Sequence, residues 1–360
     1  QENLSDGSVE GAADILLLTA PEDFGERELF AVDQFLMKGG TVITSTSHFK
    51  TSYANRSLTM VPNDSGLDDW FAHNGINIER QLVMDPQNSA FPAPVTRNIG
   101  GFQIQEMRML DYPYFPDVRG SALNSSNLIT SELPQLTMAW ASPIIIDNEK
   151  SKNRVVTKLL QSSEKSWVSD SLDILPRITG QGVSPFVPQG PQESHLLGVI
   201  IEGRFESYFA GRSPPKAEAE TPDEDSTDST TDAPLELDNV VDHSPDIARI
   251  ILFSSNEFLN DQTLQMLGSA EQTSYVNSVQ MLANAIDWSL EDQGLLSIRS
   301  RGHFNRTLPP LANSTQVLWE YLNYALSGLV IIGIALRVRA KRKSTNDLYQ
   351  GLFDRKEEVA

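Results

Sequence analysis

The chain has 360 residues, enough for two ordinary domains, and a formal net charge of −20 at pH 7. Nucleic acid repels such an acidic surface, so nucleic acid is excluded as a partner. Anionic lipid also binds an acidic surface poorly, except at the basic C-terminal tail. The chain contains no cysteine, which excludes disulfides, thiolate metal sites and cysteine nucleophiles.

A strand–helix–strand unit is predicted near the N-terminus. Residues 14–19 (DILLLT) form a short continuous apolar run, typical of a strand buried on both faces. Residues 25–38 have helical spacing, with acidic residues near the start and the Gly39-Gly40 pair at the end. Residues 41–46 (TVITST) follow as a β-branched strand. This βαβ unit predicts an α/β domain with a mainly parallel sheet flanked by helices.

The middle of the chain carries weaker signals. The spacing of apolar residues predicts a helix over residues 63–76. Residues 87–143 have no clean period and are expected to form loops with short strands, and residues 161–191 are also expected to be loop. Short strands are expected at 81–84, 144–146, 155–160 and 196–201.

An acidic segment rich in proline, serine and threonine covers residues 213–245. It has too little apolar surface to order itself, so we expect a solvated loop; a metal-binding or docking tail is the less favoured alternative. Order is expected to return with a strand at 248–254, a turn or short helix at 256–260, a helix at 274–288 and a short strand at 295–299.

Strong predicted strands on both sides of the acidic segment suggest that it interrupts one domain. We therefore expect an extracytoplasmic α/β domain formed by residues 1–212 and 246–300, followed by a connector over residues 301–316. The alternative is that the acidic segment links two independent domains. The chain starts at Gln1 without a signal peptide, so we expect that an N-terminal part was removed or omitted.

A transmembrane helix is predicted at residues 317–337, followed by a cytoplasmic tail over residues 338–360. Its central stretch, YALSGLVIIGIAL, carries no charge. Aromatic residues mark one end and basic residues the other, as in a single span with a cytoplasmic C-terminus: Trp319, Tyr324, Arg337, Arg339 and Lys341. Gly328 and Gly333 are small enough for close approach of another helix. A buried core helix is the alternative.

Polar residues follow three of the predicted strands. In open parallel sheets, ligands bind beyond the carboxyl ends of the strands. We expect a ligand or partner cleft there, formed by Thr19, Ser45, Ser47, His48, Ser255, Asn256 and Glu257. Ordinary turn and helix-cap chemistry uses the same residue types and is the favoured alternative.

Recognised catalytic patterns are missing from the sequence. The histidines are scattered, none has HExxH spacing, and there is no GxSxG elbow, P-loop or GxGxxG. We therefore expect no catalytic residue, no cofactor and no metal.

Several segments together resemble a known family. The stretch ADILLLTAPEDFGERELFAVDQFLMKGGTVI, above all its Asp33-Gln34-Phe35 and Gly39-Gly40 pieces, resembles the GldG family, the gliding-motility-associated auxiliary subunits of ABC-2 type transporters. Further blocks fit the same pattern: Gly66-Leu67, Asn74-Gly75, Leu82-Val83-Met84-Asp85, ARIILFSSNEFLND, VQMLANAIDW and LLSIRSR. A C-terminal apolar helix followed by basic residues completes it.

The resemblance implies a non-enzymatic auxiliary subunit that works with a permease and an ATPase on other polypeptides. It would be held in the bacterial inner membrane by a single C-terminal span, with its bulk periplasmic. The implied fold is three-layered, like flavodoxin, glutamine-amidotransferase domains and a domain of an intraflagellar transport protein. The family's N-terminal membrane segment and opening strand are missing from this sequence, which suggests a fragment or split subunit. A stand-alone solute- or peptide-binding module and a hydrolase of unfamiliar type are the alternatives.

Overall fold

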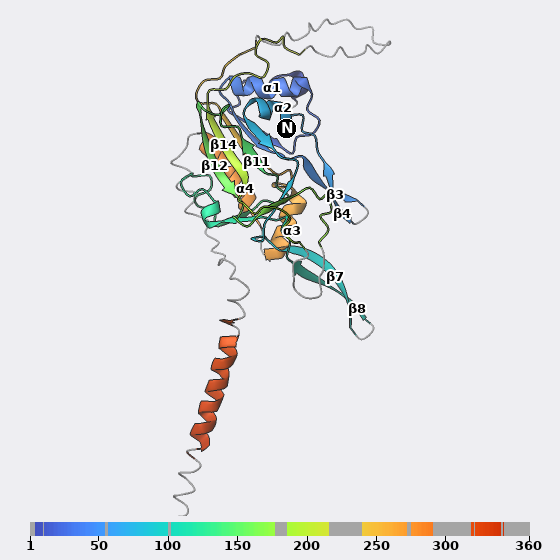
Figure 1. Cartoon of the computed structure of the whole chain (residues 1–360), viewed down its shortest axis with the longest axis vertical. Coiled ribbons are helices and arrows are strands. Elements are labelled where there is room, and N and C mark those ends of the chain that lie inside the picture. The colour runs from blue at the N-terminus through green and yellow to red at the C-terminus, as the bar shows by residue number, and fades with distance from the viewer. Residues whose placement is uncertain are drawn as a thin grey trace, which may run out of the picture. The chain divides into compact units, whose positions relative to one another are not determined.

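The computed structural model describes residues 4–9, 11–54, 57–99, 102–176, 186–215, 240–271, 275–290, 318–319, 321–339 and 341. The chain divides into two units, residues 1–304 and 305–360. Each is described by itself. The first contains the strands and four of the helices, and the second contains one long helix (Figure 1).

A seven-stranded sheet is the centre of the first unit (Figure 1). The strand order is β1-β2-β15-β14-β11-β5, and β12 also pairs with β14. The bounds are Ile15–Thr19 (β1), Thr41–Ser45 (β2), Arg249–Phe253 (β15), Leu196–Gly203 (β14), Ile144–Ile146 (β11), Ile76–Ile78 (β5) and Arg154–Gln161 (β12).

The predicted strand–helix–strand unit is confirmed. Helix α1, Glu26–Met37, connects β1 to β2, and these two strands pair in parallel with Ile15 opposite Thr41. The Glu28 side chain accepts a hydrogen bond from the Gly25 N–H at 3.1 Å, which satisfies one donor of the first helical turn. After α1, Gly39 has a φ of 96°, a conformation that glycine adopts without strain.

The prediction of a mainly parallel sheet is wrong beyond β15. β15 is parallel to β2, but β14 is antiparallel to β15, and β12 and β11 are antiparallel to β14. β5 is also antiparallel to β11. Parallel neighbours need a long crossover connection, usually a helix. No described helix connects β11, β12 and β14 along the chain, so these strands alternate in direction. An apolar run such as LLGVII predicts burial on both faces but not strand direction.

Helices cover both faces of the sheet, as the three-layer prediction requires. On one face, Val42 of β2 and Ile250 of β15 pack in a cluster with α1 and with helix α2, Asp68–His73. On the other face, Ile43 and Ile251 pack with Met281 and Ala285 of helix α4, Asn277–Ser289. Neighbouring residues of one strand therefore enter opposite cores.

Asp33, on the buried side of α1, is fully buried, and its carboxylate is surrounded by hydrogen-bond donors. Its Oδ1 atom accepts from the Trp70 indole N–H at 3.0 Å and from the Tyr208 backbone N–H at 3.0 Å. Its Oδ2 atom accepts from the Ser207 hydroxyl at 2.6 Å and from the Gln34 side chain at 3.1 Å. A buried carboxylate needs such partners, and here they connect α1 to α2 and to the chain after β14.

Gln34 holds the chain on the other side of the acidic segment. Its Oε1 atom accepts from the Val241 backbone N–H at 2.8 Å. Residues 207–208 and residue 241 are therefore both bonded to α1, close to the two ends of the segment that separates β14 from β15. Residues 216–239 of the acidic segment, and the strand predicted at 295–299, lie outside the described residues.

Helix α2 is shorter than the helix predicted at residues 63–76. The Asp64 carboxylate accepts from the Gly66 N–H at 3.0 Å, and the Ser65 hydroxyl accepts from the Leu67 N–H at 3.2 Å. These local side-chain bonds give the backbone a non-helical alternative, so the helix begins only at Asp68.

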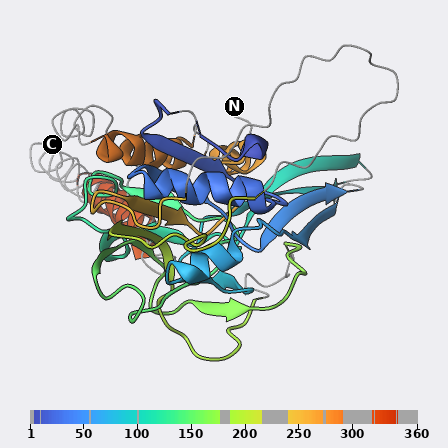
Figure 2. The ribbon, with the colours of Figure 1, turned by 90° about the horizontal axis from the view of Figure 1, so that it is seen from above.

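Two β-ribbons and a third helix were not predicted. β3 (Phe49–Ala54) pairs antiparallel with β4 (Ser57–Pro62), and β7 (Phe91–Ile99) pairs antiparallel with β8 (Phe102–Leu110). Both ribbons extend from the same side of the unit (Figure 1, Figure 2). Helix α3, Asp261–Glu271, begins just after the turn predicted at 256–260. The remaining elements are η1 (Leu4–Asp6), β6 (Leu82–Met84), β9 (Asp117–Arg119), η2 (Gly120–Ala122), β10 (Gln135–Thr137) and β13 (Trp167–Ser169).

The second unit contains an apolar helix over Tyr321–Arg339. Its most apolar window has a mean hydropathy of 1.6, and that window has no buried side chain. The helix is long and apolar enough to cross a membrane.

Replacing Asp33 with alanine should lower the free energy of unfolding by about 3 kcal/mol, because several buried donors lose their charged acceptor. Urea denaturation of the full chain in mild detergent, followed by tryptophan fluorescence, measures this. The control is Glu26→Ala on the exposed side of the same helix, which should change stability by less than about 0.5 kcal/mol. Equal effects of the two variants would contradict the structural role of Asp33.

Candidate functional site

The predicted site residues lie at the carboxyl ends of β1, β2 and β15, as expected from the parallel pairing of these strands. Thr19 is exposed at the end of β1, which is an edge strand. The other six are buried: Ser45, Ser47, His48, Ser255, Asn256 and Glu257.

The ends of β2 and β15 are connected by serine hydroxyls. Ser45 Oγ donates to the Ser255 carbonyl at 2.5 Å. Ser255 Oγ donates in turn to the Ala139 carbonyl at 2.6 Å and accepts from the Glu257 backbone N–H at 3.1 Å. Both hydroxyls therefore hold neighbouring backbone in place.

Asn256 holds the turn that leaves β2. Its side-chain amide donates to the carbonyls of Ser47 and Phe49, both at 2.8 Å. Its side-chain oxygen accepts from the Ser47 N–H at 3.3 Å. One amide side chain thus satisfies three backbone groups between the end of β2 and the first residue of β3.

Glu257 fixes the start of the β3–β4 ribbon. Its carboxylate accepts from the Thr51 backbone N–H at 2.7 Å and from the Thr263 hydroxyl of α3 at 3.4 Å. Thr51 belongs to β3, so the carboxylate connects β3, the end of β15 and α3. We call this set of contacts, formed by Ser45, Ser255, Asn256 and Glu257, the strand-end brace.

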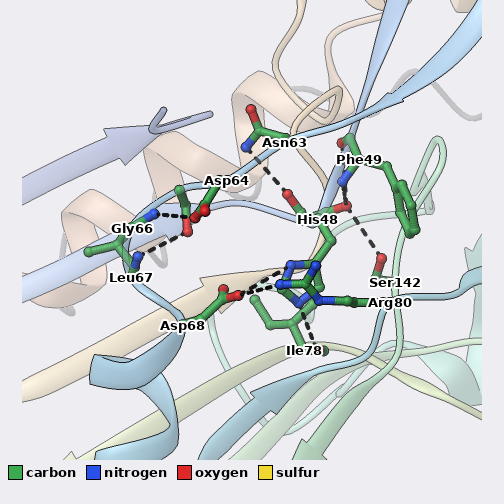
Figure 3. Close-up of polar contacts among 12 residues, drawn as sticks. His48, Phe49, Asn63, Asp64, Gly66, Leu67, Asp68, Ile78, Arg80 and Ser142 are labelled. Atoms are coloured by element: carbon green, nitrogen blue, oxygen red, sulfur yellow. Dashed lines mark hydrogen bonds and ion pairs between the residues drawn. The ribbon is translucent and has the colours of Figure 1, made fainter. Parts of the chain in front are cut away.

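His48 lies at the edge of the same region (Figure 3). Its Nε2 atom is 2.9 Å from the Ile78 carbonyl, so this nitrogen carries the proton and donates. Its Nδ1 atom is 3.5 Å from Asp68 Oδ2, and Arg80 is 3.3 Å from the same carboxylate oxygen. The His48 ring thereby connects β2 to β5 and to the first turn of α2.

The region does not contain a nucleophile paired with a base among the predicted residues. The Ser47 hydroxyl contacts Ser142 Oγ at 3.3 Å and the backbone of Phe49, whereas the His48 ring contacts Ile78 and Asp68 (Figure 3). Nucleophilic catalysis requires the two side chains to share a hydrogen bond. Among the described residues, no group of three or more histidine, aspartate or glutamate side chains is placed to hold a metal ion.

The geometry thus shows a hydrogen-bonded brace at the edge where a ligand cleft was expected. Local turn chemistry accounts for part of these contacts: Ser47 Oγ accepts from the Phe49 N–H, and Ser255 Oγ accepts from the Glu257 N–H. The other contacts join segments that are far apart in the chain. Ligand binding at this edge stays a prediction.

Sequence reasoning assigned no role to Asp85 and His195, at the same edge. Asp85 is buried after β6, and its carboxylate accepts from the Ser163 N–H at 2.7 Å and hydroxyl at 2.6 Å. Burial lowers the pKa of His195 below its ordinary value, an effect that nearby Glu193, Glu79 and Asp85 partly oppose. Asp33 and Asp85, two of the carboxylates in the segments that resemble the family, are therefore buried structural anchors. The burial of these two aspartates could not be predicted from the sequence, because burial depends on how distant segments pack together.

A cavity of about 620 Å³ lies at the opposite edge of the sheet, near the amino ends of the parallel strands. Asp14, Thr41 and Arg249 line it, together with the ends of α1 and α4. The Arg249 guanidinium is engaged: it donates to Glu202 at 3.1 Å and to the Ser289 carbonyl at 3.0 Å, and it lies over the Trp288 ring. The sequence prediction had placed no site at this edge.

Comparison with known proteins identifies the family. Residues 2–285 match the model of a family described as "ABC-type uncharacterized transport system". The chain belongs to this family. Members are auxiliary components of ABC-type transport systems, which agrees with the broad family expected from sequence.

Other comparisons add little to the family assignment. Comparison with curated proteins gives no match. Among solved structures, the "mmIFT52 N-terminal domain" is similar over 80% of this chain and 82% of that chain, with 10% sequence identity and a TM-score of 0.39.

Replacing Asn256 with alanine should lower the free energy of unfolding by about 2 kcal/mol, because the buried Ser47 N–H loses its acceptor and the Ser47 and Phe49 carbonyls lose their shorter hydrogen bonds. Thr19→Ala, at the same edge but exposed, is the control and should change stability by less than about 0.5 kcal/mol. Denaturation of the full chain measures both. If Asn256→Ala left stability unchanged, Asn256 would not act as a brace.

Proposed function

We propose that the chain is a membrane-anchored, non-enzymatic auxiliary subunit of an ABC transporter complex. The observation that carries this proposal is the family match over residues 2–285, which covers the α/β unit. The apolar helix at Tyr321–Arg339 of the same chain supplies a means of anchoring that unit to a membrane.

The anchor would be a single C-terminal span in the bacterial inner membrane, with the α/β unit on the periplasmic side. Trp319 and Tyr324 lie near one end of the helix, where aromatic rings favour the headgroup region. Arg337, Arg339 and Lys341 lie at the other end, and this positive charge favours the cytoplasm.

The helix would pack against a multi-span permease. Gly328 and Gly333 leave open space within 4 Å of where a side chain would begin, so another backbone could come close. The ATPase would be a separate polypeptide, as the family resemblance implies. The α/β unit would contact the substrate or envelope partners. The finer assignment to the GldG type, with a role in gliding motility, rests on the sequence resemblance.

The two alternatives from sequence have less support. A stand-alone solute- or peptide-binding module would use the carboxyl edge of the parallel strands, where six of the seven expected residues are buried and hydrogen-bonded to protein. A hydrolase would need a nucleophile and a base in contact, and Ser47 and His48 bond to other groups instead.

Purification of the full chain from its native host in mild detergent should recover a multi-span permease and a P-loop ATPase in comparable amounts, measured by mass spectrometry. Gly328→Leu and Gly333→Leu should each reduce this recovery, because a larger side chain blocks close helix packing. Ser327→Leu is the control. Ser327 lies at least about 100° around the helix axis from each glycine, so a larger side chain there should not block packing at the glycines. Recovery of the folded protein alone would contradict the proposal.

The membrane orientation is tested separately with single cysteines, because the native chain has none. Ser213→Cys, on the α/β unit, should react in intact spheroplasts with a maleimide that cannot cross the membrane. Ser344→Cys, after the basic residues, should react only once the membrane is lysed. The reverse pattern would place the α/β unit in the cytoplasm and contradict the proposed orientation.

A further inference from the structure

The β7–β8 ribbon projects from the α/β unit (Figure 1). Phe91, Ala93 and Leu110 at the base are buried in a cluster of aromatic and aliphatic side chains. Beyond the base, every residue of β8 from Phe102 to Met109 is exposed. Four of these residues are large and apolar: Phe102 (77% exposed), Ile104 (47%), Met107 (57%) and Met109 (41%).

The two edges of the ribbon differ. β7 carries Pro92 and Pro94, which lack a backbone N–H, and α3 packs against this strand. β8 contains no proline, and among the described strands it pairs with β7 alone. Prolines protect an edge strand from pairing with another chain, so β7 has this protection and β8 lacks it.

An open β8 edge leaves half of its backbone N–H and C=O groups directed away from β7. An isolated ribbon of two strands is marginally stable in water and needs a third strand or a packed helix. Helix α3 supports the β7 side, whereas β8 is exposed from Phe102 to Met109, so the β8 edge can accept a further strand.

We propose that β8 pairs antiparallel with β8 of a second copy of this chain, with the two-fold axis at Met107. Charge complementarity selects both the partner and the register. Glu106 and Arg108 lie on either side of Met107, and centring on Met107 is the only antiparallel register that places Glu106 of each copy opposite Arg108 of the other. Opposite charges directly across a ladder stabilise pairing, whereas like charges oppose it.

The same register also brings exposed apolar residues together. Met107 (57% exposed) lies opposite Met107 of the second copy, and Met109 lies on the same face of the strand, because residues two apart point the same way. The product is a four-stranded sheet, β7-β8-β8-β7, that pairs the open edges of both copies. This dimer does not depend on the transport role proposed above.

Disulfide cross-linking of the full chain in native membranes tests the register, because single cysteines can be introduced without background. Directly opposite residues have Cα atoms about 4.5–5.5 Å apart, which suits a disulfide. Met107→Cys should therefore form a dimer as the main product on mild oxidation. Gln103→Cys, exposed on the same strand, is the matched control: its two copies would be about 27 Å apart at 3.4 Å per residue, so it should remain monomeric.

Charge reversal in the Met107→Cys background tests the partner contacts. Glu106→Arg and Arg108→Glu should each reduce the cross-linked fraction, because each places like charges opposite one another. The double variant Glu106→Arg/Arg108→Glu should restore cross-linking. All of these side chains are exposed, so folding is not at risk, and an unchanged melting temperature checks this. Equal cross-linking of Met107→Cys and Gln103→Cys, or no response to charge reversal, would overturn the proposal.

Discussion

The parallel pairing of β2 with β15 is the contact on which the rest of the α/β unit depends. It places Val42 beside Ile250 although most of the chain lies between them, and it defines the centre of the sheet. Because the strands are parallel, their carboxyl ends meet at one edge. Ser45, Ser47, Ser255, Asn256 and Glu257 are neighbours for this reason alone. Closing so long a loop costs chain entropy, which the two packed cores on either face offset.

Polar residues in this protein are used mainly to secure irregular backbone to the sheet and helices. Asn256 satisfies three groups of the turn after β2, and Asp33 collects four donors from three separate segments. Buried polar groups cost free energy unless they are paired, so each buried polar side chain must find a hydrogen-bond partner. Polar residues that suggest a binding site when only the sequence is known therefore act here as structural contacts. The family membership, rather than any chemical site, therefore carries the functional conclusion. A subunit that works through contacts with other polypeptides needs surfaces more than catalytic groups.

Elements with a strong local pattern were predictable. The strands at β1, β2, β14 and β15 and the helices α1 and α4 follow from continuous apolar runs or helical spacing, and the structure confirms them. The ribbons were not predictable by the same rule. β8 alternates apolar and polar residues over 102–105 (FQIQ) and again over 106–109 (EMRM), but the phase shifts between the two stretches. β7 contains two prolines, so neither strand has the continuous pattern that marks a buried strand. Only pairing with each other makes them strands.

Local spacing and composition were enough to predict the α/β class, the first βαβ unit and the apolar C-terminal helix. The broad family was predicted from the resemblance of several sequence blocks to a known family. The sequence also located the strand ends that lie together. Tertiary structure alone decided the mixed direction of the sheet, since an apolar run is the same in either direction and only the connections set it. Tertiary structure also decided that the polar strand ends form a brace: whether Ser45, Asn256 or Glu257 faces solvent or a neighbouring backbone group depends on segments far apart in the chain.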